Sequence, residues 1–286
     1  MTLSADSNRD IPDIAAAGSP RQTGAKVRRA SPVTTARIVS ALTILALLLA
    51  WLVSAHFKLV SPVFLPSPQT VLWKFYSVAT TGFVDATLWQ HLTASLFRVF
   101  AALLFALVVA IPAGIAIGIS AVGRGIFDPV IEFLRPIPPL AYLPLIIIWF
   151  GIGEPSKILV IAIAMLAPIA ISTASGVKGA SQDRINAARA LGATRFQVIL
   201  HVILPSALPS ILTGLRIALG AGWSTLVAAE LVAATRGLGF MIQSAAQFLV
   251  TDVVIMGIFV IAIVAFILEI GIRRLERVLV PWSGKE

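Results

Sequence analysis

The residues that could carry out catalysis in this chain of 286 amino acids are few and scattered. Cysteine is absent, which excludes disulfides and thiolate metal sites. The histidines His56, His91 and His201 lack metal-ligand spacing. No phosphate-binding Gly-x-x-x-x-Gly-Lys-Ser/Thr loop, His-Glu-x-x-His motif or Gly-x-Ser-x-Gly turn is present, and Gly237-Leu-Gly239 lacks a third glycine and a following helix and so indicates a turn. We therefore predict a chain that is not an enzyme and holds no cofactor or metal.

Charged residues inside or beside long apolar runs are the second chemical signal. They are Arg98, Glu132, Arg135, Arg216, Glu230, Asp252 and Glu269. A charge at membrane depth is costly and is a functional hypothesis by default. Pairing explains Glu132 and Arg135, which are three residues apart, and snorkelling explains Arg98 and Glu269 near the ends of their runs. A structural role is therefore favoured for these charges, and no ladder of acids indicates a proton relay.

The elements that position these residues are predicted to be membrane-spanning helices. The chain is 58% hydrophobic and 12% charged, with a mean hydropathy of +0.96, so lipid must be part of its solvent. Six apolar runs are long enough to cross a bilayer: roughly 38–56, 93–119, 130–151, 157–177, 207–232 and 251–271. The expected fold class is an all-α membrane protein with about six transmembrane helices. Residues 1–35 are polar and are expected to form a disordered tail.

The basic residues outside these runs predict the orientation. A cytoplasmic N-terminus followed by six spans places most of them on the cytoplasmic side: Arg9, Arg21, Lys26, Arg28, Arg29, Arg37, Arg124, Lys178, Arg184, Arg189, Arg195, Arg273, Arg274, Arg277 and Lys285. The other side receives Lys58, Lys74, Lys157 and Arg236. This positive-inside bias predicts that both termini are cytoplasmic. It also explains the net charge of +9 without a nucleic-acid partner.

The third apolar run is unusual because four prolines lie close together in it. They are Pro136, Pro138, Pro139 and Pro144. Each proline removes a backbone donor and clashes with the preceding turn. Irregular backbone at membrane depth survives only when it is buried in protein or lines a wet cavity. The segment is therefore a candidate pathway wall, or else residues 135–139 are an interfacial lead-in and only residues 140–150 span the membrane.

Two apolar runs carry small residues at every fourth position. The second run has Ala102, Ala106, Ala110, Gly114 and Gly118, and the fifth has Gly214, Ala218 and Gly222. Such stripes allow another helix to approach closely. The alternative is that part of the pattern is chance, because alanine and glycine are common in membrane helices.

The segment between the fourth and fifth runs has the signals of two short helices. Ser181 and Asp183 indicate a helix start, and Gly192 can end that helix by adopting a positive φ. Thr194 and Gln197 have capping-box spacing and open a second helix, which Pro205 interrupts before the fifth run. A helical knob of this shape can fit a groove on a soluble partner, whereas the alternative is a long solvated loop.

This knob resembles the EAA loop of permease subunits of bacterial binding-protein-dependent ABC importers. The matching pattern is Ala187-Ala188, then Gly192, then Val202-x-Leu204-Pro205. Asn186 stands where that family has Glu. In the family this loop docks on a separate ATPase subunit. The resemblance therefore implies that the ATPase-coupling residues of this chain are Arg184, Asn186, Ala187, Ala188, Arg189, Gly192, Leu204 and Pro205.

Other blocks resemble the sulfonate, nitrate and taurine branch of that family. They are Arg135-Pro-Ile-Pro-Pro-Leu-Ala, Trp149-Phe-Gly-Ile-Gly-Glu154, Leu215-Arg216, Trp223, Ala229-Glu230 and Gly237-Leu-Gly239. The blocks 85–92 and 222–240 are most similar to the taurine importers of the branch. The resemblance implies an importer permease for taurine, with aliphatic sulfonates, nitrate or another small anion as the alternative.

The resemblance also implies a type I importer permease fold and a set of partners. A first helix and periplasmic segment would occupy 36–91, the core 92–274 with its coupling loop 178–206, and a C-terminal tail 275–286. The partners would be two ATPase subunits that bind ATP and Mg²⁺, a second copy of this chain and a periplasmic solute-binding protein, all at the cell inner membrane. Candidate pathway or gate residues are Pro138, Pro139, Arg216, Trp223, Glu230 and Arg236, and Arg236 would contact the binding protein or steer the solute.

Overall fold

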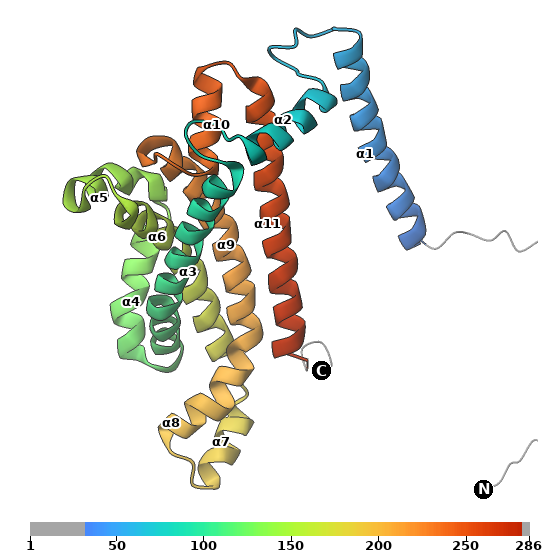
Figure 1. The fold of residues 1–286 in the computed structure, drawn as a ribbon. Coiled ribbons are helices and arrows are strands. Elements are labelled where there is room, and N and C mark those ends of the chain that lie inside the picture. The colour runs from blue at the N-terminus through green and yellow to red at the C-terminus, as the bar shows by residue number, and fades with distance from the viewer. Residues whose placement is uncertain (1–31, 282–286) are drawn as a thin grey trace, which may run out of the picture. The chain divides into compact units, whose positions relative to one another are not determined.

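The computed structural model describes residues 32–281, and within that range it is helical without a β-strand (Figure 1). The α-helices are α1 (Pro32–His56), α2 (Pro68–Thr80), α3 (Leu88–Ile119), α4 (Ala121–Leu134), α5 (Leu143–Phe150), α6 (Glu154–Lys178), α7 (Gln182–Ala190), α8 (Arg195–Val198), α9 (Leu204–Ala233), α10 (Leu238–Gln247) and α11 (Thr251–Leu279). A 3₁₀ turn, Pro139–Tyr142, precedes α5, and a π-helical turn, Ile199–Ile203, joins α8 to α9.

The ends of the chain differ in detail from the expected tails. Residues 1–31 and 282–286 lie outside the described range, and with them most of the predicted disordered tail. Helix α1 begins at Pro32 and α11 ends at Leu279, so both extend into the stretches assigned to tails. The chain divides after Leu49 into two units, and the unit from Ala50 onward contains α2 to α11. Up to Leu49 the described side chains of α1 are exposed, and all except Arg37 are apolar or small polar groups, as expected of a helix in lipid.

Five helical segments are long and apolar enough to cross a bilayer, and a sixth exists if a bent helix pair is one span. The five are Ala36–His56, Leu88–Ile119, Glu154–Lys178, Arg195–Val232 and Thr251–Leu279. The bent pair, Ala121–Leu134 and Pro139–Phe150, turns through 92° at its break. The third predicted run, 130–151, is therefore not one continuous helix: it contains the end of α4, a proline-rich break and α5. This agrees with the irregular backbone that its prolines predict. The prolines at 136, 138 and 139 cause the break because none can donate to the preceding turn.

The core forms where α6 lies between α3 and α9 (Figure 1). The small-residue stripe of α3 faces α6, and a Cβ built on Gly114 would lie 2.6 Å from the Ala170 carbonyl oxygen. The stripe of α9 faces the other side of α6, where a Cβ on Gly214 would lie 2.5 Å from the Ser172 Cβ. The expected close packing is confirmed for both stripes. It is tight enough that a methyl group at these positions displaces backbone or side chain.

A second apolar cluster joins α2, α10 and α11 at the end of the bundle opposite α7 and α8 (Figure 1). Leu238, Met241 and Met256 are fully buried in it. The end of α1 contacts this unit through Trp51, which stacks on Phe259 with ring centroids 5.9 Å apart. The Trp51 indole also donates to the Pro66 carbonyl at 3.0 Å. The two ends of the bundle therefore differ: one is covered by packed short helices, and the other carries the knob.

Replacing Gly114 by alanine should destabilise the protein by about 1–3 kcal/mol, because the added methyl group overpacks the α3–α6 contact. The matched control is Gly220→Ala, since a Cβ at Gly220 meets nothing within 4 Å. Thermal unfolding of the detergent-solubilised protein measures both. Equal melting temperatures for the two variants would contradict the packing described here.

Candidate functional site

The knob between α6 and α9 is built as its capping signals predict. Helix α7 begins after Ser181, although the serine side chain makes no capping hydrogen bond. Gly192 has φ +85, and its N–H donates to the Arg189 carbonyl at 2.9 Å. The Thr194 hydroxyl and the Gln197 amide form the reciprocal capping box that opens α8. Gly192 therefore ends the first short helix, and the capping box begins the second.

Pro205 does not interrupt the second helix, contrary to the sequence prediction. Helix α8 passes through the π-helical turn into α9, and Arg195–Val232 forms one continuous candidate span of 38 residues. Pro205 occupies the first turn of α9. A proline destabilises a helix little at this position, because the π-helical turn before it already interrupts the regular α-helical hydrogen bonds. The knob is consequently joined to α9 without a flexible joint.

One face of the knob is buried and the other is exposed. Ile185 of α7 and Val198 of α8 are buried beside Val177 at the end of α6 and Ala207 at the start of α9. On the outer face, Leu191 is 89% exposed and Phe196 is 70% exposed. Two large exposed apolar side chains on a polar segment that joins two candidate spans make this face a candidate contact with another protein.

The residues assigned to docking from the sequence lie on both faces of the knob. Exposed positions are Arg184, Asn186, Ala187, Arg189 and Gly192. Half-buried positions are Ala188, Leu204 and Pro205, which face the ends of the spans. Leu191 and Phe196 were not singled out from the sequence, and the signal that could have found them is their apolar character inside a polar loop.

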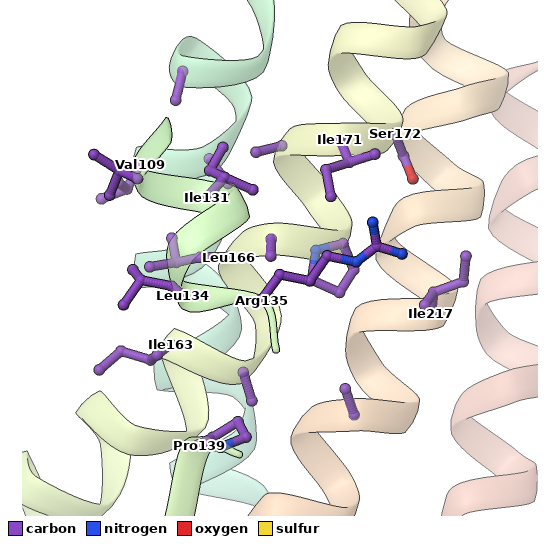
Figure 2. Close-up of a pocket in the computed structure, with 18 of the residues that line it drawn as sticks. Val109, Ile131, Leu134, Arg135, Pro139, Ile163, Leu166, Ile171, Ser172 and Ile217 are labelled. Atoms are coloured by element: carbon purple, nitrogen blue, oxygen red, sulfur yellow. The ribbon is translucent and has the colours of Figure 1, made fainter. Parts of the chain in front are cut away.

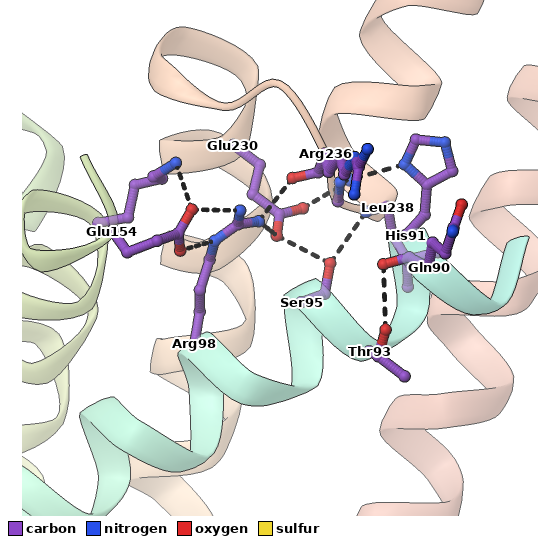
Figure 3. Close-up of polar contacts among 12 residues, drawn as sticks. Gln90, His91, Thr93, Ser95, Arg98, Glu154, Glu230, Arg236 and Leu238 are labelled. Carbon is purple, nitrogen blue, oxygen red and sulfur yellow. Dashed lines mark hydrogen bonds and ion pairs between the residues drawn. The ribbon is translucent and has the colours of Figure 1, made fainter. Parts of the chain in front are cut away.

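At the opposite end of the bundle, Arg98 is the centre of a buried polar network (Figure 3). Its Nε and Nη2 donate to the Glu154 carboxylate at 2.6 and 2.8 Å. Its Nη1 donates to Glu230 Oε1 at 2.6 Å and to the Arg236 carbonyl at 2.7 Å. Arg98 is 3% exposed, so the prediction that it snorkels was wrong: it is paired inside the protein instead.

Glu230 is the most deeply buried acid of the network, with none of its side chain exposed. Its Oε1 also accepts from the Ser95 hydroxyl at 2.8 Å, and its Oε2 accepts from the Gly239 N–H at 2.8 Å. Figure 3 shows the side chains of α3 and α9 converging on the chain that leads into α10. All the polar atoms of Glu230 are therefore satisfied, as a buried charge requires.

The segment Gly237-Leu-Gly239 is the start of a helix: Gly237 is the N-cap of α10, and Leu238 and Gly239 are its first two residues. The prediction of a turn without a following helix was therefore wrong. Gly237 has φ +141, and a Cβ there would lie 2.4 Å from the Glu230 carboxyl carbon. Its N–H donates to His91 Nδ1 at 3.1 Å. His91 Nε2 must then carry the proton and donate to the Phe83 carbonyl, 3.0 Å away. The glycine here permits a close approach of backbone to a carboxylate.

A cavity of about 690 Å³ is bounded by α3, α4, the proline break, α6 and α9. Figure 2 shows residues that line it. Pro139 and Arg135 line it, and its walls are otherwise mostly aliphatic. This places the proline break beside a cavity, which supports its interpretation as a pathway wall.

The other candidate pathway residues are not among those that line the cavity. Pro138 precedes the 3₁₀ turn. Arg216 pairs with Glu276 and lies 3.6 Å from Glu269. Trp223 is buried in the core, Glu230 lies in the polar network and Arg236 is exposed in the adjoining loop. Their roles in a pathway or gate remain predictions.

The chain matches the family described as binding-protein-dependent transport system inner membrane component over residues 106–280. It belongs to that family. The match spans the bent pair, the knob and α6 to α11, and so covers the cavity and most of the network. This family member is a transport component of the inner membrane, and its fold is that of ABC importer permeases.

Three relatives show where this binding-protein-dependent transport component lies within its family. It is 62% identical to the taurine transport system permease protein TauC of Escherichia coli K12, over 85% of this chain and 89% of TauC. It is 35% identical to the putative aliphatic sulfonates transport permease protein SsuC of the same organism, over 82% and 87% of the chains. The nitrate import permease protein NrtB of Synechocystis is 37% identical over 77% and 82%.

A solved structure of the MetNI methionine ABC transporter, in an inward-facing conformation, shares the fold. Its TM-score is 0.58 at 21% identity, and the match covers 65% of this chain and 93% of that one. At this identity the likeness concerns the arrangement of the helices alone. It confirms the predicted all-α importer permease fold.

Replacing Glu230 by alanine should destabilise the protein by about 3–5 kcal/mol, because it leaves part of the buried Arg98 charge unpaired. The control is Arg273→Ala, which removes an ion pair with Glu269 on the exposed side of α11 and should cost at most about 0.5 kcal/mol. Thermal unfolding in detergent compares them. If both variants melt alike, the network does not contribute as described.

Proposed function

We propose that this chain is the membrane-spanning permease of an ATP-driven taurine importer. The observation that carries the proposal is the 62% identity to TauC over 85% of the chain, against 35% and 37% for the aliphatic-sulfonate and nitrate relatives. The described structure supports a transport role because it combines a cavity within the helix bundle with an exposed knob at one end. Aliphatic sulfonates, nitrate and other small anions are the alternative cargo.

The proposed complex contains two copies of this chain, two ATPase subunits and a periplasmic solute-binding protein. ATP and Mg²⁺ would bind to the ATPase, since no phosphate-binding loop is present here. The positive-inside bias supports a cytoplasmic knob and cytoplasmic termini. Arg236, exposed on the opposite side beside Gly237, is then in position to contact the binding protein or steer an anion.

The knob is proposed to transmit motion of the ATPase to the spans. Its buried face packs on the end of α6 and the start of α9, and α8 continues directly into α9. A push on the knob would therefore move the two helices whose contact forms the core. Such a coupled element has two arrangements whose balance is shifted by ligands bound at either end.

Docking is proposed to rest on shape and apolar contact, since Asn186 supplies no carboxylate. Leu191 and Phe196 present exposed apolar side chains, and Arg184 and Arg189 are exposed residues of α7 on the same knob. Burying an exposed phenylalanine in a partner's groove contributes on the order of 1.5–3 kcal/mol. The loss of a single anionic contact from the family pattern is therefore compatible with binding.

The proposed cargo is tested in proteoliposomes that contain the permease, its ATPase and its binding protein. Labelled taurine should accumulate only when ATP is supplied inside, and it should still do so when ionophores collapse the ion gradients. Unlabelled taurine in excess should compete with the labelled taurine for uptake. Nitrate and a longer alkanesulfonate, each at the same concentration as the unlabelled taurine, should compete weakly. Preferential uptake of nitrate or of the longer sulfonate would reassign the cargo, and uptake driven by an ion gradient alone would refute the importer class.

The docking surface is tested by the substitution Phe196→Ala. Because Phe196 is 70% exposed in the free chain, its truncation should leave folding unchanged and weaken ATPase association by about tenfold, the size of effect expected for an aromatic anchor. The matched control is Phe248→Ala, which removes an equally exposed phenylalanine, 74%, at the other end of the bundle. Affinity for the isolated ATPase is measured by titration in detergent, and equal affinities for the two variants would refute docking at this face.

A further inference from the structure

Arg135 is the only charged residue among those that line the 690 Å³ cavity. The hydroxyls of Ser172 and Thr225 are the other polar side chains of the lining, and the remaining walls are apolar. In Figure 2 the Arg135 side chain extends from the end of α4 across the cavity towards Ser172 and Ile217 on the facing helices. The cavity therefore combines aliphatic walls with a single positive group.

The proline break explains how a cation comes to lie in this place. Arg135 is the C-terminal cap of α4, and its N–H donates to the Ile131 carbonyl at 2.9 Å. The following prolines prevent α4 from continuing, so the chain turns through 92° directly after Arg135. The side chain is thus held at a bend whose lining residues include Leu134, Ile137 and Pro139.

Arg135 has no ion pair or side-chain hydrogen bond within residues 32–281. Glu132, predicted from its spacing to pair with Arg135, does not do so. The other two arginines of the apolar runs are different: Arg98 contacts two carboxylates, and so does Arg216. The described part of the chain therefore provides acids for Arg98 and Arg216 and provides none for Arg135.

Arg135 is exposed in the free chain, and the apolar walls beside its unpaired guanidinium concentrate the field of that charge on the cavity. Such a group attracts an anion that enters the cavity. Its planar fork of N–H donors matches the oxygens of a carboxylate, phosphate or sulfonate better than a point charge does. The aliphatic walls suit a short carbon chain attached to that anionic group. The volume falls within the range of small-molecule sites and leaves room for water around a small solute.

We propose that Arg135 is the anion-binding residue of the translocation cavity and contacts the sulfonate group of the solute as it crosses the membrane. This assignment rests on the proposed function for the identity of the cargo, whereas the presence of an anion site rests on the cavity itself. A single unpaired cation gives a weak site. Weak binding is what an importer needs at this stage, since a tight intermediate would slow release.

The transport test compares Arg135→Gln, Arg135→Lys and Arg124→Gln in proteoliposomes that contain the whole transporter. Loss of a charged hydrogen-bond donor should reduce taurine uptake by about tenfold or more in Arg135→Gln. Lysine should restore part of the rate because it retains the charge without the fork. Arg124→Gln removes an exposed cation from the same helix, outside the cavity, and should transport as the parent chain does. Equal uptake by all variants would overturn the proposal.

A binding test separates a contact with the solute from a merely structural role. Because the chain has no cysteine, Ser172→Cys introduces a single thiol on the cavity wall facing Arg135. In the permease–ATPase complex, millimolar taurine should slow modification of this thiol by a sulfonate-bearing methanethiosulfonate reagent. That protection should vanish when Arg135→Gln is added and persist when Arg124→Gln is added. Protection that survives Arg135→Gln would refute the contact.

The source of the anion is distinguished in the same assay. Protection by nitrate or a longer sulfonate, but not by taurine, would overturn the proposed cargo. If that protection is lost in Arg135→Gln, the anion site at Arg135 is still supported. Slow modification in phosphatidylglycerol bilayers without solute, relieved in zwitterionic phosphatidylcholine bilayers, would assign the site to an anionic lipid headgroup and overturn the solute contact. Absence of protection by every anion that the complex transports would overturn the site itself.

Discussion

The close contact of α6 with α3 and α9 is the constraint on which the rest of the structure depends. Between helices in lipid the hydrophobic effect contributes little, so association relies on packing that only small residues permit. Gly114 and Gly214 on its two neighbours leave no space for a further methyl group against α6. The three helices consequently form one packed unit, and every functional feature is attached to an end or a side of it.

The two ends of this unit have different chemistry. At one end Arg98, Glu154 and Glu230 tie together α3, α6 and α9, and the backbone leading into α10 completes the network. At the other end the contacts are apolar, between the knob and the termini of α6 and α9. Buried ion pairs with full hydrogen bonding fix a geometry, because any displacement exposes an unpaired charge. Apolar contacts tolerate sliding, so the knob end is the one suited to movement.

Features that depend on neighbouring residues could be predicted from the sequence, and those that depend on distant partners could not. The capping box of Thr194 and Gln197, the positive φ of Gly192 and the small-residue stripes follow from local spacing. Arg98 and Glu230 are 132 positions apart, and neither carries a local signal that names its partner. The four prolines near Arg135 predict irregular backbone, but their spacing does not specify the angle of the bend or the cavity beside it. Glu132 and Arg135 show the converse, because favourable spacing did not produce a pair.

The comparison of Arg98, Arg135 and Arg216, the arginines in or beside the predicted apolar runs, separates charges that the fold compensates from one that it does not. Arg98 and Arg216 each have two carboxylates from other helices, so the fold compensates their charges internally. Arg135 has none among residues 32–281, although Glu132 lies only one turn before it. A cation that no protein carboxylate neutralises can pair instead with an anion that binds and dissociates. In a bundle where other arginines are neutralised, that difference supports a transient anionic occupant of the cavity rather than a permanent structural partner.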